Sequence, residues 1–85
     1  MLIVWLDEEF RDGIDRAQAL EVIDNGRDFD MDEPSKRNNK RTMYVGWNHK
    51  GDLLEVGVEW LSESHIRVFH AMPATRKYRQ LFGAE

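Results

Sequence analysis

The chain has 85 residues, of which 33% are charged, a net charge of -4 at pH 7 and no cysteine. This length suits one small domain, close to the smallest that a single core holds together without covalent staples. Disulfide frameworks and thiolate zinc sites are excluded because cysteine is lacking. The apolar residues 2–6 are too few for a signal peptide or a spanning helix, so we predict a cytoplasmic protein that does not enter a membrane.

Charge is distributed unevenly along the chain. Residues 1–34 contain eleven acids and three bases, whereas residues 35–85 contain nine bases and five acids. Phosphate binding relies on Lys and Arg, so this chain does not suit nucleic-acid binding over its whole surface. One basic face from the second half would still bind RNA, and ordinary solubilising charge is the alternative explanation.

The first quarter of the chain predicts a strand and a helix. Residues 2–6 are apolar enough for a strand that is buried on both faces. Residues 14–25 have the apolar spacing of a helix, with Asp15 as its N-cap and Gln18 at the capping-box position. Gly26 then predicts a left-handed helix stop.

A short edge strand at residues 27–30 leads into a polar stretch at residues 31–40. A loop of this length is uncommon in so small a domain and is usually functional or mobile. Its cations Lys36 and Arg37 would grip phosphate, although a simply solvated loop has the same composition.

The second half predicts a meander of three strands followed by a helix. Strands at residues 41–48 and 54–60 are joined by a turn containing Gly51, and a third strand covers residues 65–72. We expect the core face to carry Met43, Val45, Trp47, Leu54, Val56, Val58 and Trp60. A helix begins after Thr75 and ends at a glycine.

The opposite face of the meander is the candidate site. It would gather Tyr44, Glu55, Glu59, Arg67 and Phe69. A carboxylate beside an arginine and a tyrosine can run acid–base chemistry on an RNA 2′-hydroxyl. The alternative is a cross-strand Glu–Arg pair that stabilises the sheet by about 0.2–1 kcal/mol and has no other role.

The histidines do not predict a metal site, and we expect no cofactor. His65 and His70 are an odd number of residues apart on one strand, so they face opposite sides and cannot chelate one ion together. The alternation places His70 on the core face, where it is either structural or a proton shuttle beside the basic helix. The cations Arg76, Lys77 and Arg79 would hold phosphate or simply lie exposed.

The order of these features resembles the BrnT toxins, small RelE-like ribonucleases of bacterial toxin–antitoxin pairs. The resemblance covers most of the chain. In the first half it is carried by Leu2–Leu6, Asp12-Gly13 and Ile14–Asn25, and in the second half by Arg41–Trp47, Lys50-Gly51, Leu53-Leu54, Ile66-Arg67-Val68 and Ala74-Thr75. A subgroup of the family also shares His70-Ala71-Met72-Pro73 and Lys77-Tyr78. Three positions depart from the family pattern: Arg11-Asp12-Gly13 lacks its histidine, Met72 replaces an arginine, and Tyr78 replaces a glutamate.

The resemblance implies an α+β fold with an antiparallel meander sheet of three to four strands and two principal helices. It also implies a metal-independent ribonuclease that is neutralised by an antitoxin, with an acidic antitoxin segment on the exposed cations. Under this hypothesis Arg67, His70 and Glu55 are catalytic. RNA contacts would come from Arg76, Lys77, Arg79, Tyr44, Lys36 and Arg37. The alternative is a non-catalytic module of the same fold that binds protein or nucleic acid.

Overall fold

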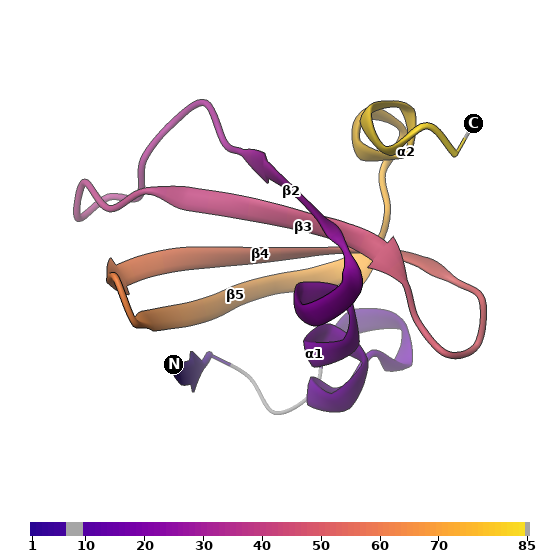
Figure 1. Ribbon diagram of the computed structural model, residues 1–85, viewed down its shortest axis with the longest axis horizontal. Helices are drawn as coiled ribbons and strands as arrows, with labels where there is room; N and C mark the ends of the chain where they lie inside the picture. The colour runs from indigo at the N-terminus through magenta and orange to yellow at the C-terminus, as the bar shows by residue number, and fades with distance from the viewer. Residues whose placement is uncertain (7–9, 85) are drawn as a thin grey trace.

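The computed structural model describes residues 1–6 and 10–84. The elements in chain order are β1 (Leu2–Trp5), a 3-10 turn (Arg11–Gly13), α1 (Arg16–Asn25), β2 (Arg27–Asp30), β3 (Arg41–Trp47), β4 (Leu53–Ser62), β5 (His65–Pro73) and α2 (Arg76–Phe82) (Figure 1). No helix in the described part of the chain is long and apolar enough to cross a membrane.

The five strands form one mixed sheet in the order β1-β5-β4-β3-β2. Strand β1 runs parallel to β5, and the other neighbours are antiparallel. The predicted antiparallel sheet of three to four strands is therefore wrong. The apolar N-terminal segment adds to the far side of β5, about sixty residues along the chain, and local alternation carries no information about so distant a partner.

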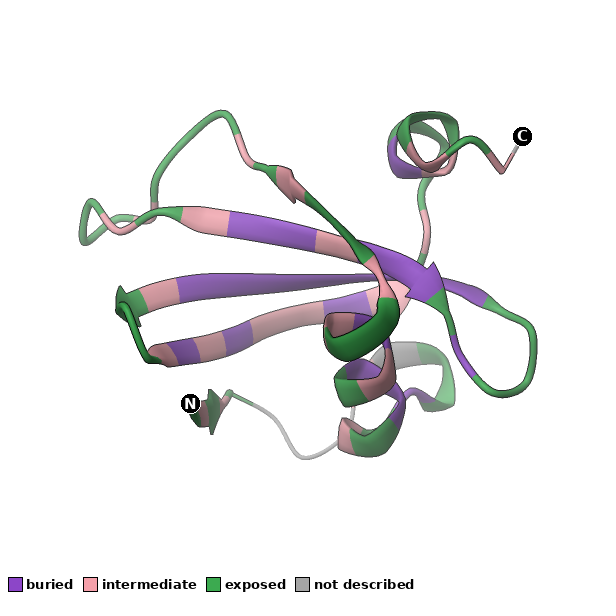
Figure 2. Cartoon of the chain, in the orientation of Figure 1, coloured by how far each residue is buried: buried purple, intermediate pink, exposed green. Residues whose placement is uncertain are grey.

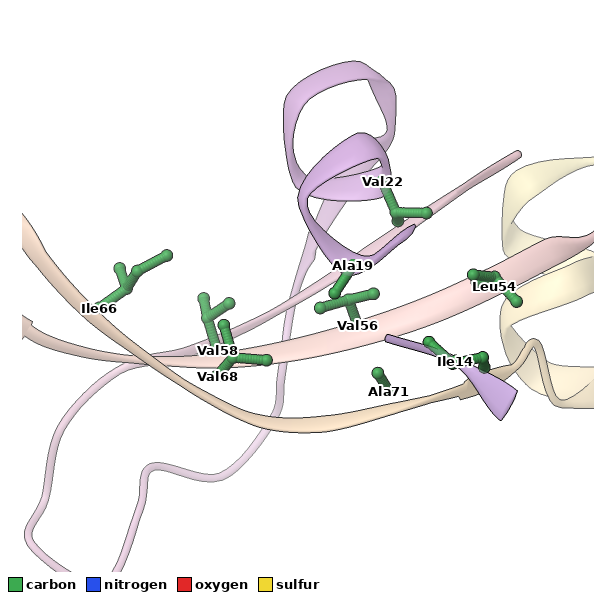
Figure 3. Packing of buried hydrophobic residues seen from close by; sticks show 9 residues of the cluster. All are labelled: Ile14, Ala19, Val22, Leu54, Val56, Val58, Ile66, Val68 and Ala71. Atoms are coloured by element: carbon green, nitrogen blue, oxygen red, sulfur yellow. The ribbon is translucent and has the colours of Figure 1, made fainter. Parts of the chain in front are cut away.

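Helix α1 covers one face of the sheet and forms the main core there. Its Ala19 and Val22 pack against residues of β4 and β5 that are fully buried (Figure 3). The buried members of this cluster are Ile14, Ala19, Val22, Leu54, Val56, Val58, Ile66, Val68 and Ala71. Figure 2 shows the same distribution, with burial concentrated along the middle strands and exposure at the hairpin ends.

The N-terminal end of α1 follows the sequence prediction, and the C-terminal end does not. The Asp15 carboxylate accepts a hydrogen bond from the Gln18 N–H at 3.0 Å, which confirms the predicted N-cap. Gly26, however, has φ -83° and is extended, so the predicted left-handed stop is wrong. A Cβ at Gly26 would lie 2.5 Å from the Val22 carbonyl oxygen and 2.7 Å from that of Val45. Glycine is needed here because the helix end passes directly over β3.

Helix α2 packs on the opposite face of the sheet, over β3. Tyr78 is buried there with Met43, Val45 and Leu53. Gly83 ends the helix with φ 89°, which confirms the glycine stop. Thr75 precedes the first turn, but its side chain makes no capping bond to the helix.

The register between β3 and β4 differs from the predicted one. Trp47 pairs with Leu53, and Met43 with Gly57, so the apolar side chains of β3 lie on the face of α2 rather than that of α1. Trp47 is 49% exposed beside Phe82, whereas Trp60 lies on the α1 face. The predicted shared core position of the two tryptophans is therefore wrong, because the 48–52 turn shifts the pairing by one residue relative to the expected alternation.

A β-bulge interrupts the pairing of β4 with β5. Gly57 pairs with His70 and Val58 with Val68, which leaves Phe69 as an extra residue. Beyond the bulge the alternation is reversed, so His70 lies on the same face as Gly57 instead of in the core. The predicted core position of His70 is therefore wrong, and the bulge is the physical reason.

Candidate functional site

The face of β4 and β5 that lies opposite α1 carries most of the ionisable groups of the sheet, and we call it the open face. It comprises Glu55, Gly57 and Glu59 on β4 and Arg67, Phe69 and His70 on β5. Both glutamates are almost fully buried, with 3% and 2% of their surface exposed. Buried carboxylates are costly unless they are paired, so the partners of these two define the site.

Glu55 is held by donors from two elements. Its Oε2 lies 2.8 Å from Nε2 of His70, and its Oε1 accepts hydrogen bonds from both the N–H and the hydroxyl of Thr75, each at 2.7 Å. Pro73 and Ala74 turn the chain so that Thr75 reaches back to β4, and the Ala74 N–H donates to the Leu53 carbonyl. The arrangement fixes one edge of the imidazole.

The environment keeps Glu55 ionised. Burial alone would raise the pKa of its carboxyl, but the hydrogen bonds from His70 and Thr75 outweigh burial and lower that pKa below its ordinary value. A fixed carboxylate on one ring nitrogen sets the tautomer and the orientation of a histidine. His70 keeps 30% of its side chain exposed, so solvent and ligands reach it.

Glu59 is the centre of a second ionic cluster. Its oxygens accept hydrogen bonds from Arg37 at 2.8 and 3.3 Å and from the Asn39 amide at 3.0 Å, and Arg67 binds the same carboxylate from β5. The 31–40 loop is thereby attached to the sheet. Burial raises the pKa of Glu59, but hydrogen bonds from Ser35, Asn39 and Arg37 outweigh this effect and lower it.

The Glu59 cluster leaves positive charge at the surface. Two guanidinium groups share one carboxylate, and Lys36 adds a third cation to the shallow pocket that Ser35, Arg37 and Arg67 also line. The Nε atom of Arg67 is buried and has no hydrogen-bond partner. An anion in this pocket would find several donors and net positive charge.

An aromatic spacer separates the two clusters. A Cβ on Gly57 would lie 2.8 Å from the Phe69 ring, so the glycine makes room for this ring on the open face. The Arg41 guanidinium lies 5.7 Å from the centre of the same ring. Across the bulge Arg67 lies opposite Glu59 and His70 opposite Gly57, which are two residues apart on β4, so at about 3.3 Å per residue roughly 7 Å separates Arg67 from His70 along the strand.

The structure therefore brings together only part of the predicted catalytic set. Glu55 and His70 form a pair, whereas Arg67 binds Glu59 and belongs to the other cluster. Tyr44 was predicted for this face and is on the other one, packed against the α1 core, because of the register of β3. Thr75 is a site residue that sequence reasoning missed, since its side chain only gains a partner through the turn after β5.

The remaining predicted phosphate ligands lie around the two clusters. Arg76 follows Thr75 and is exposed, as is Lys77, whose ammonium group lies 5.3 Å from the Tyr78 ring centre. The guanidinium of Arg79 donates to the Ala84 carbonyl at the end of α2. Arg37 is bound to Glu59, and Lys36 lies beside it in the loop.

Within residues 1–6 and 10–84, no three His, Asp or Glu side chains gather as a metal-ligand set. The fold and the site define a small α+β domain with an ionic face on a five-stranded mixed sheet. Comparisons with protein-family models, with curated proteins and with solved structures find no match.

Proposed function

We propose that the protein is an RNA-cleaving toxin of a toxin–antitoxin pair, with the Glu55–His70 pair as its acid–base centre. The observation that carries the proposal is the 2.8 Å contact between Glu55 Oε2 and His70 Nε2, at an exposed edge of a cation-bearing face. The resemblance of the chain to the BrnT toxins supports the same conclusion.

The proposed reaction is transesterification within the RNA strand. With its Nε2 proton directed at Glu55, His70 presents the Nδ1 lone pair to a 2′-hydroxyl and takes its proton. The 2′-oxygen then forms a bond to the adjacent phosphorus, and the bond from phosphorus to the 5′-oxygen breaks. The leaving 5′-oxygen takes a proton from water, and the hydroxide that remains takes up the proton that His70 removed, which restores neutral His70. The products are a 2′,3′-cyclic phosphate and a free 5′-hydroxyl, and no metal or cofactor is needed.

The surrounding cations have separate roles in this proposal. Arg76 directly follows Thr75, which binds Glu55, so we assign it and Lys77 to the charge that develops on the reacting phosphate. Arg67, roughly 7 Å from His70 along the strand, holds a neighbouring phosphate together with Lys36 and Arg37. Preorganised donors of this kind typically contribute about a hundredfold or more in rate.

An antitoxin would neutralise this activity by covering the same cations with an acidic segment. Association driven by charge slows as salt rises above about 0.15 M, where the Debye length falls below roughly 8 Å. Lys36 and Arg76 are both exposed, and an extended acidic segment that covered both would block the open face.

The test measures growth and RNA together. Induction of the wild-type protein in bacteria should arrest growth, and the purified protein should release 2′,3′-cyclic ends from an RNA oligonucleotide. His70→Asn should remove both effects while circular dichroism and RNA binding stay unchanged. Glu63→Ala, in the exposed β4–β5 turn, is the matched control and should keep both.

A wild-type protein that neither arrests growth nor cleaves RNA would overturn the proposal. The second candidate, a non-catalytic binding module, then gains support from one observation. Two arginines that could serve a reaction, Arg37 and Arg67, are bound to the buried Glu59 instead. In that case the wild type should bind RNA oligonucleotides without cutting them, and Arg67→Ala should weaken this binding.

A further inference from the structure

An apolar groove lies between α1 and β1, on the side of the sheet opposite the open face. It has a volume of about 680 Å³. Its apolar lining consists of Met1, Ile3, Ala17, Leu20, Ile23 and Tyr44. Leu20 is 40% exposed and Met1 73% exposed, so apolar surface from a helix and from a strand faces solvent across the same hollow. Contiguous apolar surface of this kind is typical of protein interaction sites.

The rim of the groove is acidic. Glu21 and Asp24 lie along its α1 side. Asp28 of β2 lies opposite Tyr44 of β3 in the sheet. Burial raises the pKa of the Tyr44 hydroxyl, and the nearby Asp28 carboxylate raises it further. Glu21 also contacts His49 at 2.8 Å, whereas Asp24 is exposed.

The spacing of these residues suits a helical ligand. Leu20 and Ile23 are three residues apart on α1, and so are Glu21 and Asp24. An apolar stripe and an acidic stripe therefore run side by side along the helix axis. A second helix laid beside α1 would place residues at i, i+3 and i+4 against the apolar stripe and its flanking side chains against the acids.

The arrangement of the sheet leaves space for such a helix. One helix of ten residues covers this face, and it lies mainly over β3 and β4. Strand β1 is at the end of the sheet order and has no neighbour on its outer side within the described part of the chain. The groove lies between this edge and α1, where a second helix would complete the layer.

We propose that this groove binds a basic amphipathic helix of a partner protein. Its apolar residues would fill the hollow over Leu20, Ile23 and Ile3, and its Lys or Arg side chains would pair with Glu21 and Asp24. Charge complementarity selects this occupant, since an acidic helix would be repelled by the rim. The inference goes beyond the proposed nuclease function, because the groove and the Glu55–His70 pair are on opposite faces of the sheet.

The test uses two synthetic helical peptides of eighteen residues, one built from leucine and lysine and one from leucine and glutamate. The leucine–lysine peptide should bind the full chain, and the leucine–glutamate peptide should not. Amide shift changes in NMR spectra should concentrate in α1 and β1. Raising the salt concentration from 0.05 to 0.3 M should weaken binding severalfold.

Leu20→Asp is the decisive variant, because it adds an acid while removing apolar surface. Binding driven by charge alone would tighten, whereas docking in the groove should weaken by about tenfold or more, which is roughly 1.4 kcal/mol per factor of ten. Leu81→Asp is the matched control, since Leu81 is 47% exposed on α2 and lies outside the groove. It should change binding by less than about twofold.

Two results would overturn the proposal. The first is unchanged or tighter binding in Leu20→Asp, or equal binding of the two peptides. The second is self-association of the chain through the groove. It would appear in sedimentation as a dimer that is lost in Leu20→Asp and that persists when the leucine–lysine peptide is added. Circular dichroism of each variant checks that it is folded. Asp24→Lys, which keeps Leu20, should independently weaken the binding of the leucine–lysine peptide.

Discussion

Arg37 and Glu59, which are 22 residues apart in sequence, form a two-pronged ion pair with bond lengths of 2.8 and 3.3 Å. The glutamate is almost fully buried and the arginine side chain is 54% exposed. The same carboxylate also binds Arg67 and Asn39. One buried group thus attaches the 31–40 loop to β4 and β5. Loss of the buried carboxylate and loss of the half-exposed arginine should therefore change the free energy of unfolding by different amounts.

Glu59→Gln should destabilise the protein more than Arg37→Ala. The glutamine removes the charge that balances two guanidinium groups, and breaking such a partly buried pair costs about 2–3 kcal/mol. Arg37→Ala leaves Glu59 with Arg67 and Asn39, and the lost contact is half-exposed, so a cost below about 1 kcal/mol is expected. Urea unfolding of both variants measures the difference. Equal losses would show that the loop, and not the carboxylate, provides the stability.

The stability should fall in acid more steeply than exposed carboxylates alone would cause. The pKa values of Glu55 and Glu59 are lower in the folded protein than their ordinary value of 4.5. Their stabilisation is therefore fully present above pH 4.5 and is lost as pH falls below that value towards the folded pKa values. Unfolding midpoints at pH 7 and pH 3 measure the loss. In Glu59→Gln the loss of stability between pH 7 and pH 3 should be smaller. A pH dependence equal to that of the wild type would contradict the contribution assigned to Glu59.

The two tryptophans of the hairpin should differ in their contribution to stability. Trp60 packs against the main core and donates a hydrogen bond from Nε1 to the Thr42 hydroxyl at 3.0 Å. Trp60→Ala should cost about 3 kcal/mol. Trp47 is half-exposed and contacts Phe82 edge-on, so Trp47→Ala should cost about 1 kcal/mol. Thermal melts of both variants measure the two losses. A larger loss in Trp47→Ala than in Trp60→Ala would contradict the register between β3 and β4.

Gly26→Ala should be among the most damaging single-methyl additions in this chain. The new Cβ would meet two backbone carbonyl oxygens, at 2.5 and 2.7 Å, and neither can move without shifting α1 or β3. We expect a loss of about 3 kcal/mol or more. Gly57→Ala is the control, because its Cβ would meet the Phe69 ring, which can rotate. It should cost clearly less, and a comparable loss would mean that the Phe69 ring is rigidly held.

Local signals in the sequence predicted the elements better than their arrangement. The N-cap at Asp15, the glycine stop at Gly83 and the strands of the second half follow from short-range rules, and the structure confirms them. The parallel pairing of β1 with β5 could not be predicted, because it joins the two ends of the chain. The register of β3 depends on the number of residues in one turn, which alternation alone does not determine.

The candidate site was predicted in part. Glu55, Glu59 and Arg67 were expected on the face opposite the core, and they lie there. Tyr44 was assigned to that face and His70 to the core, and both assignments fail because a shift of one residue reverses every side chain after it. Thr75 could not have been found, since its hydrogen bonds to Glu55 depend on where the turn after β5 places the backbone.

The bulge at Phe69 makes the proposed acid–base pair depend on the path of the β5 backbone as well as on its residue types. The same residues in a regular ladder would turn His70 towards the core and away from Glu55, although every amino acid of the site would be unchanged. A relative that lacks Phe69 would keep its histidine opposite Gly57 without a bulge, whereas one that keeps this residue and pairs regularly would be inactive by this mechanism. Such a pair of chains would show how activity is gained or lost through one local irregularity of a strand, with no substitution at the site.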